Sequence, residues 1–331
     1  MSDTFPALWI TETGEGSFQR DIVERRTDDL PDGEVLVKVS YSALNYKDAL
    51  SASGNKGVTR RFPHTPGIDA AGVVAESHSA DFPPGTEVLV TSYDLGMNTS
   101  GGFAGYIRVP ADWVVPLPTG LSLQDSMVLG TAGLTAAISI HKLRHAGVTP
   151  DKGEVLVTGA SGGVGSLGVA ILARLGYTVI AGTGKTAAQD WLRGLGATGF
   201  VNREALLDSS GKPLLKPQWA GVLDTVGGEV LATALKTTQP QGAVSCCGNV
   251  ASIKLPTTVF PFILRGIDLL GVDSQNYPMA QRRDLWTKLA TDWKPADLAS
   301  MMTATDLTAL KDRWIDAILA GETQGRVVVK L

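Results

Sequence analysis

The hydrophobic pattern of the chain changes near residue 123. Before that point, short β-rich runs alternate with turns rich in proline and glycine, and the clearest runs are Ala7–Ile10, Glu34–Val39 and Thr86–Val90. From Leu123 to His145 the apolar residues follow helical spacing, and Gly147 ends this segment. The pattern predicts a β-rich, barrel-like first domain and then a helix that leads into a different kind of domain.

Strands and helices alternate beyond that helix as far as about Ser274, which is typical of a parallel, doubly wound sheet. The expected strands are Val155–Val157, Tyr177–Ala181, Gly199–Val201, Gly221–Asp224, Gly242–Cys246 and Leu269–Val272. The tail from Pro278 is mostly helical, and its expected core residues are Trp286, Leu289, Trp293, Leu298, Trp314 and Ile318. A strand-like run at Gly325–Leu331 follows these helices, so we expect the chain to return to the first domain.

The length of 331 residues favours two domains. We expect an α/β fold with a barrel-like domain of residues 1–123 plus 275–331 and a Rossmann domain of residues 124–274. No apolar run approaches the roughly 20 residues of a membrane helix, and the first residues lack the pattern of a signal peptide. The two cysteines, Cys246 and Cys247, are adjacent and form no disulfide framework, so we expect a reducing cytoplasm. A net charge of −4 with interspersed signs argues against nucleic-acid binding.

A cluster of small residues, Gly159–Gly165, lies between the strand Val155–Val157 and an apolar helix that reaches about Leu175. Gly176 ends this helix, and a second strand-like run follows at once. Strand, glycine turn, helix and strand together form the dinucleotide-binding pattern, in which glycines allow a tight turn and a close approach to a pyrophosphate. The alternative is an ordinary tight turn, but the flanking pattern favours a nucleotide site.

The end of the second strand indicates which dinucleotide binds. A site for NAD usually carries an acidic residue there, which binds the ribose 2′-hydroxyl. Here the chain continues as Ala181–Lys185, with small residues and no acid, and Asp190 lies too far into the next helix. Thr183 and Lys185 can bind a 2′-phosphate, so the pattern favours NADPH. A solvated surface lysine remains the alternative for Lys185.

These motifs add up to a family resemblance. The segments that carry it are Ser42–Leu50, Pro66–Gly72, Gly130–Ala136, the glycine turn, Asp224–Gly228, Leu255–Arg265, Gly271–Ser274 and Gln324–Arg326. In this order they resemble the zinc-free medium-chain dehydrogenases/reductases of the quinone-oxidoreductase type, and more narrowly the acrylyl-CoA reductases. The resemblance implies a GroES-like catalytic domain beside the Rossmann domain.

Zinc alcohol dehydrogenases of this superfamily carry a cysteine, a His-Glu pair and a second cysteine at positions that we match to Tyr46, Ile68-Asp69 and Thr131. Zinc requires thiolate, imidazole or carboxylate ligands, and Asp69 alone could not hold the ion. We therefore expect no metal. Alcohol oxidation then becomes a poorer interpretation than reduction of an activated C=C bond by hydride.

The resemblance implies a site beside the nicotinamide. Tyr46 would position the ring, donate a hydrogen bond to the enolate or supply a proton, and plain packing is its alternative role. Asn45 and Asp69 are further catalytic candidates, although Asp69 could equally be a carboxylate bound to backbone N–H groups of a loop.

The same resemblance implies a set of cofactor contacts. The residues are Tyr46, Thr131, Ser161, Gly162, Gly163, Val164, Thr183, Gly184, Lys185, Arg203, Gly248, Asn249, Asp273, Ser274 and Arg326. Arg203 would face the adenosine end of the cofactor or be a surface arginine, and Arg265 could anchor a loop or an interface.

The expected function is NADPH-dependent reduction of an α,β-unsaturated acyl-CoA, most closely acrylyl-CoA to propionyl-CoA. A quinone or enone reductase with the same site is the first alternative, and a non-enzymatic NADPH-binding sensor or structural protein is the second. Arg60 and Arg61 are weaker candidates for contacts with the phosphates of CoA.

Two further segments have competing interpretations. Cys246 and Cys247 end a buried type of strand, so we expect them to pack rather than to form a redox pair. The apolar segment Val259–Leu264 reads as a loop and is a candidate surface for a homodimer, or else a lid.

Overall fold

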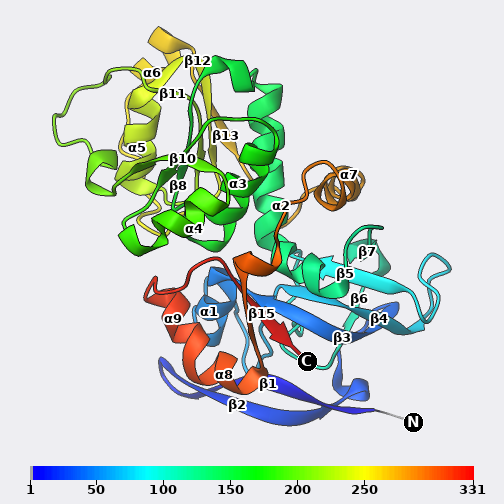
Figure 1. Cartoon of the computed structure of the whole chain (residues 1–331). Coiled ribbons are helices and arrows are strands. Elements are labelled where there is room, and N and C mark those ends of the chain that lie inside the picture. The colour runs from blue at the N-terminus through cyan, green and yellow to red at the C-terminus, as the bar shows by residue number, and fades with distance from the viewer. Residues whose placement is uncertain (1–2) are drawn as a thin grey trace. The chain divides into compact units, whose positions relative to one another are not determined.

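The structure, a computed structural model, describes residues 3–331 (Figure 1). It divides into two compact units, one of Met1–Thr131, Gln275–Ala290 and Asp297–Leu331 and the other of Ala132–Ser274 and Thr291–Ala296. The division falls within helix α2 (Leu123–His145), where Gly130 departs from helical geometry with φ 51° and ψ −155°. The first turns of α2 belong to the first unit because their backbone groups bond to residues of that unit.

The first unit is built mainly from antiparallel strands. Its seven-stranded sheet has the order β14-β15-β3-β4-β5-β7, with β6 paired to β3, and a separate hairpin is formed by β1 and β2. The strands are β1 (Thr4–Gly14), β2 (Ser17–Arg26), β3 (Val35–Leu44), β4 (Asp69–Ser77), β5 (Glu87–Thr91), β6 (Tyr106–Val109), β7 (Val114–Pro116), β14 (Met302–Thr305) and β15 (Arg326–Lys330). Its helices are α1 (Tyr46–Ala52), α7 (Met279–Ala290), α8 (Leu307–Ala309) and α9 (Ile315–Leu319), and a π-helical turn at Leu310–Trp314 joins α8 to α9.

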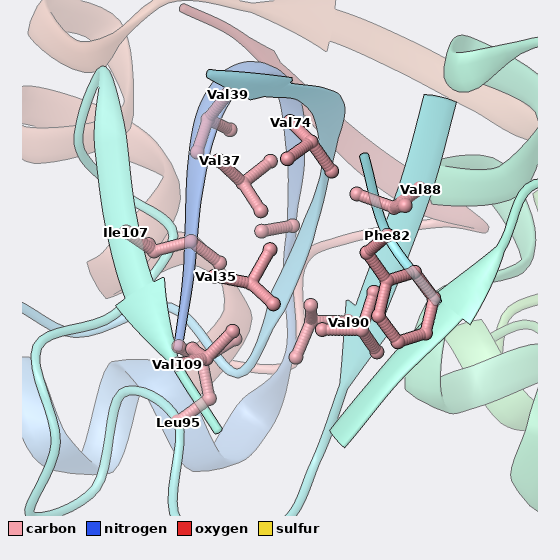
Figure 2. Close-up of a cluster of buried hydrophobic side chains, with 12 residues drawn as sticks. Val35, Val37, Val39, Val74, Phe82, Val88, Val90, Leu95, Ile107 and Val109 are labelled. Carbon is pink, nitrogen blue, oxygen red and sulfur yellow. The ribbon is translucent and has the colours of Figure 1, made fainter. Parts of the chain in front are cut away.

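The interior of this unit follows from the two-residue period of its strands. Val35, Val37 and Val39 point to one face of β3 and lie in one buried cluster with Val88 and Val90 of β5, two strands away in the sheet (Figure 2). Each of these five valines is at most 4% exposed. On the opposite face of β3 Lys38 is exposed, whereas Leu36 is buried in a separate cluster with Phe5 and Tyr106.

The last strand confirms the predicted return of the chain. β15 pairs antiparallel with β3, so that Val327 lies opposite Leu44. Val327 and Val329 are buried in a second cluster with Leu8 and Ile10 of the hairpin. Residues more than 280 positions apart in the sequence therefore share one core.

The second unit confirms the predicted doubly wound sheet. Its six strands have the order β10-β9-β8-β11-β12-β13, and every neighbouring pair is parallel. The strands are β8 (Val155–Thr158), β9 (Val179–Gly182), β10 (Ala197–Val201), β11 (Trp219–Asp224), β12 (Thr238–Cys246) and β13 (Asp268–Gly271). The helices between them are α3 (Gly163–Arg174), α4 (Gln189–Gly194), α5 (Gly228–Thr237) and α6 (Phe260–Arg265). Strand order reverses between β8 and β11, and this is where open sheets of this kind bind ligands.

The apolar segment that the sequence indicated as a loop is largely helical. Phe260–Arg265 forms α6, which begins with Pro261 in its first turn and ends at Gly266 in a left-handed conformation. Val259, Ile263 and Leu264 are each more than 60% exposed. Within residues 3–331, no helix is long and apolar enough to cross a membrane.

Candidate active site

The glycine turn after β8 has the close packing that its sequence predicted. A Cβ atom on Gly165 would lie 2.3 Å from the carbonyl oxygen of Gly159, so only glycine allows α3 to start this near the strand. Gly162 is the N-cap of α3 and offers no side-chain hydrogen bond. The first N–H groups of α3 therefore remain available to an anion.

The side chains predicted to bind the pyrophosphate and the adenosine end of a cofactor lie at the ends of three adjacent strands. Ser161 follows β8, Thr183 and Lys185 follow β9, and Arg203 follows β10. The Thr183 hydroxyl donates to Ser161 Oγ at 3.3 Å, and the Lys185 N–H donates to Thr183 Oγ1 at 3.1 Å. A Cβ atom on Gly184 would approach Arg203 Cβ to 3.7 Å, so these two residues are neighbours.

A buried carboxylate to which sequence reasoning assigned no role joins β8 and β11, the two strands between which the strand order reverses. Asp224, at the end of β11, accepts a hydrogen bond from Thr158 Oγ1 of β8 at 2.7 Å and from the Gly227 N–H at 2.8 Å. Burial raises the pKa of Asp224, and these hydrogen bonds oppose the rise. Its signal in the sequence was a lone acid at the end of an apolar strand.

The remaining predicted contacts in this unit also lie beyond the carboxyl ends of strands. Gly248 and Asn249 follow β12, and Asp273 and Ser274 follow β13. The Ser274 hydroxyl accepts a hydrogen bond from Thr135 at 2.9 Å. The structure thus brings all the predicted cofactor residues of the second unit to one edge of its sheet.

In the first unit, three predicted residues surround Asp69. They are Asn45, Thr131 and Arg326, and together with Asp69 they form the Asp69 group. The Asp69 carboxylate is fully buried and accepts bonds from Thr131 N at 2.9 and 3.0 Å, Thr131 Oγ1 at 2.6 Å and Asn45 Nδ2 at 2.8 Å. Burial raises the pKa of Asp69, while Arg326 and these hydrogen bonds oppose the rise. The geometry matches the loop-anchoring alternative for Asp69.

Arg326 is the buried cation of the same group. It is 2% exposed, with one guanidinium nitrogen 3.6 Å from Asp69 Oδ2, and it donates to Asn45 Oδ1 and to the carbonyl of Leu44, both at 3.1 Å. It also donates to the carbonyl of Val128 in α2 at 3.0 Å. Gly130 leaves the space for this ion pair, since a Cβ there would lie 2.5 Å from Asp69 Oδ2.

Tyr46 is the first residue of α1 and is half-buried. Within residues 3–331, its hydroxyl has no hydrogen-bond partner. The sequence matched Tyr46 to the first zinc ligand of the metal-dependent relatives, but the residue that binds Asp69 next to Thr131 is Asn45.

The residues around Asp69 do not fit a zinc site. Among them only Asp69 has a side chain that zinc binds in proteins, and its oxygens are already hydrogen-bonded to Thr131 and Asn45. No cluster of three or more His, Cys, Asp or Glu side chains suited to a metal occurs in the part of the chain described.

Asp48, the other buried carboxylate beside Asn45, binds N–H groups at the start of α1. Asp48 Oδ2 accepts from Asn45 N at 2.8 Å and from Asn45 Nδ2 at 3.1 Å, and Oδ1 accepts from Ile68 N at 2.8 Å. Burial, and then the charge of Asp69, raise the pKa of Asp48 to about 7, while the three N–H bonds oppose the rise.

This shift predicts a pH effect on stability. A carboxyl group whose pKa is higher in the folded state binds its proton more tightly when folded, so the free energy of unfolding should fall as pH rises from about 4 to about 7. Asp48→Asn should flatten that part of the profile, as followed by urea unfolding at several pH values in this range. An identical slope in both proteins would contradict a proton on Asp48.

Sequence reasoning also missed a strained turn after β5. Ser92 and Tyr93 both adopt left-handed φ values, 65° and 51°, which are uncommon for residues other than glycine. The fully buried Arg282 of α7 donates to the carbonyl of Thr91 at 2.7 Å, and its guanidinium lies 4.2 Å from the centre of the Tyr93 ring. Such strain persists where surrounding contacts impose it, often at functional sites.

The turn is joined to the Asp69 group by hydroxyls. Ser92 Oγ lies 2.8 Å from Thr131 Oγ1. Because Thr131 gives its hydroxyl proton to Asp69, Ser92 is the donor in this bond. The Thr131 hydroxyl can therefore only accept a further hydrogen bond.

Two family models match the chain, the alcohol dehydrogenase GroES-like domain over residues 31–119 and the zinc-binding dehydrogenase over residues 163–291. The fold and these matches define an oxidoreductase of two domains, one GroES-like and one of Rossmann type. The chain belongs to the medium-chain dehydrogenase/reductase family.

Its relatives cover nearly the whole chain. YhfP of Bacillus subtilis, described provisionally as a quinone oxidoreductase, is 46% identical over 100% of both chains. Acrylyl-CoA reductase AcuI of Ruegeria pomeroyi is 43% identical over 98% of each. The crystal structure of the yhdH oxidoreductase from Salmonella enterica in complex with NADP has a TM-score of 0.95 and 43% identity, covering 98% of this chain and 99% of that one. A crystal structure of Bacillus subtilis yhfP with NAD bound has a TM-score of 0.96 and 43% identity over 99% of this chain and 100% of that one.

Proposed function

We propose that this protein is an NADPH-dependent reductase of the C=C bond of an α,β-unsaturated acyl-CoA, and that acrylyl-CoA is its substrate. The observation that carries the proposal is the Asp69 group, in which the carboxylate binds the hydroxyl of Thr131, at a position matched to a zinc ligand, and the amide of Asn45, which precedes the matched Tyr46. Hydride addition to a polarised alkene needs no metal. The near full-length similarity to an acrylyl-CoA reductase supports the thioester as substrate.

The cofactor would be held by the second unit. The N–H groups at the start of α3 and the Ser161 hydroxyl would bind the pyrophosphate, and Thr183, Lys185 and Arg203 would bind the 2′-phosphate. Arg203 is exposed and, among residues 3–331, its guanidinium has no partner. Bound NADPH would supply the hydride for the β-carbon of the alkene.

The first unit would stabilise the charge that develops on the thioester oxygen as the enolate forms. We assign the Tyr46 hydroxyl as the donor to this oxygen, because it is accessible and has no partner within residues 3–331. Asn45 forms the N-cap of the helix that Tyr46 begins, and Arg326 and Asp69 hold the Asn45 side chain from both sides. In this proposal Asp69 and Arg326 act through Asn45 and do not touch substrate or cofactor.

The test is oxidation of NADPH, followed by absorbance, with acrylyl-CoA, crotonyl-CoA and a simple quinone, each repeated with NADH and with a chelator. Rapid, chelator-resistant turnover of acrylyl-CoA with NADPH is the expected result. Faster turnover of the quinone would instead support the second candidate function, a quinone reductase, which the similarity to YhfP favours. Tight binding of NADPH without turnover of any substrate would indicate a sensor.

The choice between NADPH and NADH depends on this chain's own residues, since one relative has been crystallised with NADP and another with NAD. We expect Lys185→Ala to lower kcat/KM for NADPH on the order of 10–100-fold, because a charge-assisted bond to the 2′-phosphate is lost. The same change should leave kcat/KM for NADH nearly unchanged. Equal losses with both cofactors would remove Lys185 from the phosphate site.

We also propose a homodimer in the cytoplasm. β13 is an edge strand of the six-stranded sheet, and the exposed Val259, Ile263 and Leu264 lie close before it in the chain. An open strand edge beside apolar side chains suits pairing with a second copy. Sedimentation of the purified protein as a monomer would contradict the dimer.

A further inference from the structure

Two adjacent arginines, Arg60 and Arg61, are exposed in the segment that follows α1 in the first unit. Among residues 3–331, neither guanidinium has a hydrogen bond, an ion pair or a ring contact. Arg20 of the same unit, by contrast, pairs with Asp316 at 2.8 Å. Two neighbouring cations without a counter-ion make a position suited to an anion.

The backbone that carries these arginines is held in place. The hydroxyls of the buried Thr59 and Ser51 lie 2.7 Å apart, which ties the segment to the last part of α1. The Arg60 N–H donates to Asn98 Oδ1 at 3.3 Å, and Asn98 Nδ2 donates to Asp94 Oδ1 at 2.9 Å. The segment is therefore anchored both to α1 and to the loop that follows the strained turn.

These anchors join the arginine segment to the same helix that carries Tyr46. α1 begins at Tyr46, and Ser51 lies about 7.5 Å further along the helix axis. The arginine segment therefore starts beside the last part of α1, whereas Tyr46 is the first residue of this helix. A substrate that reaches both places must be long, with its reactive carbon at one end and negative charge at the other.

We infer that Arg60 and Arg61 form the subsite for the phosphate groups of the CoA part of the substrate. The inference deepens the proposed reduction of an acyl-CoA and rests on it. In a CoA thioester the flexible pantetheine arm separates the acyl group from the phosphates, and guanidinium groups bind phosphate through paired hydrogen bonds. The phosphates of NADPH are assigned to the second unit, so they leave this pair available.

The neighbouring charges agree with this role. Lys56, in the same segment, pairs with Glu12 at 2.6 Å. The carboxylate of Asp94 accepts bonds from Asn98 and from the Thr99 hydroxyl. Both carboxylates already have partners of their own, which leaves the arginine pair as the cationic group of this segment.

The experiment compares two thioesters of the same acyl group, acrylyl-CoA and acrylyl-N-acetylcysteamine, which lacks the phosphates. The variant is the double substitution Arg60→Gln, Arg61→Gln, and the control is Arg283→Gln, an exposed arginine of α7. The double variant should raise KM for acrylyl-CoA by roughly tenfold and leave KM for acrylyl-N-acetylcysteamine and for NADPH unchanged. Calorimetric binding of free CoA should weaken by a similar factor, and added salt should reduce the difference.

The outcomes separate this inference from the proposed function. Unchanged KM and unchanged CoA binding in the double variant, with both thioesters still reduced, would overturn the subsite and leave the reductase in place. Equal rises for both thioesters would show a general effect on the site and would also overturn it. A wild-type protein that reduces neither thioester and does not bind CoA would overturn both proposals.

Discussion

Replacing Arg326 by methionine is expected to lower the free energy of unfolding by about 3–5 kcal/mol, as is usual when one partner of a buried ion pair is removed. The change leaves the fully buried carboxylate of Asp69 without its neighbouring cation. It also removes a donor from the carbonyls of Leu44 and Val128, which join two segments of the first unit. Unfolding in urea, followed by tryptophan fluorescence, measures the effect.

Two further variants make this prediction specific. Arg283→Met, at an exposed position, should change stability by less than about 0.5 kcal/mol. The double variant Asp69→Asn, Arg326→Met should recover part of the loss, because no buried charge then remains uncompensated. A loss below about 1 kcal/mol for Arg326→Met would mean that Asp69 is neutral in the folded protein.

Tyr46→Phe is expected to lower kcat for acrylyl-CoA by roughly 100-fold, the usual cost of losing one hydrogen-bond donor to an oxyanion. The substitution removes only the hydroxyl and keeps the ring at the start of α1. The Kd of NADPH should stay within about twofold, because the lost interaction forms only in the transition state. Steady-state kinetics together with a fluorescence titration of NADPH would measure both quantities.

Tyr41→Phe is the matched control, since Tyr41 is a half-buried tyrosine of the adjoining strand β3. Its kcat should stay close to that of the wild-type protein. If Tyr46→Phe also keeps its kcat, the hydroxyl has no part in the chemistry. A rise in the Kd of NADPH without a fall in kcat would instead indicate that Tyr46 positions the cofactor.

Much of the fold could be predicted because its elements have strong patterns. The helix expected at Leu123–His145 has the same bounds in the structure, and buried parallel strands such as Val155–Thr158 read as continuous apolar runs. The hairpin strand Ser17–Arg26 was not predicted, because it is largely exposed and rich in charged residues. The start of β12 was placed at Gly242, four residues late, since its first residues are polar.

The sequence predicted those site residues that lie in short continuous motifs, but not how residues from distant segments come together. The turns after β8 and β9 are each a short continuous stretch of sequence, so Lys185 could be named from its place after a strand and Ser161 from the family resemblance of the glycine turn. The Asp69 group could not be assembled in this way, because Arg326 reaches it from the last strand and Ser92 from a strained turn. A left-handed serine has no sequence signal, since contacts with the rest of the fold impose it.

The pairing of β15 with β3 has a consequence for the order in which the protein can form during synthesis. Residues 326–330 leave the ribosome only after the whole second unit has been made, yet they supply both an interior strand of the first unit and the cation for Asp69. The second unit is nearly contiguous in the chain and can fold as soon as it emerges. Until then the edge of β3 that pairs with β15 stays open. A nascent chain halted before residue 326 should therefore contain a folded nucleotide domain and an incomplete first unit, which chaperones can bind.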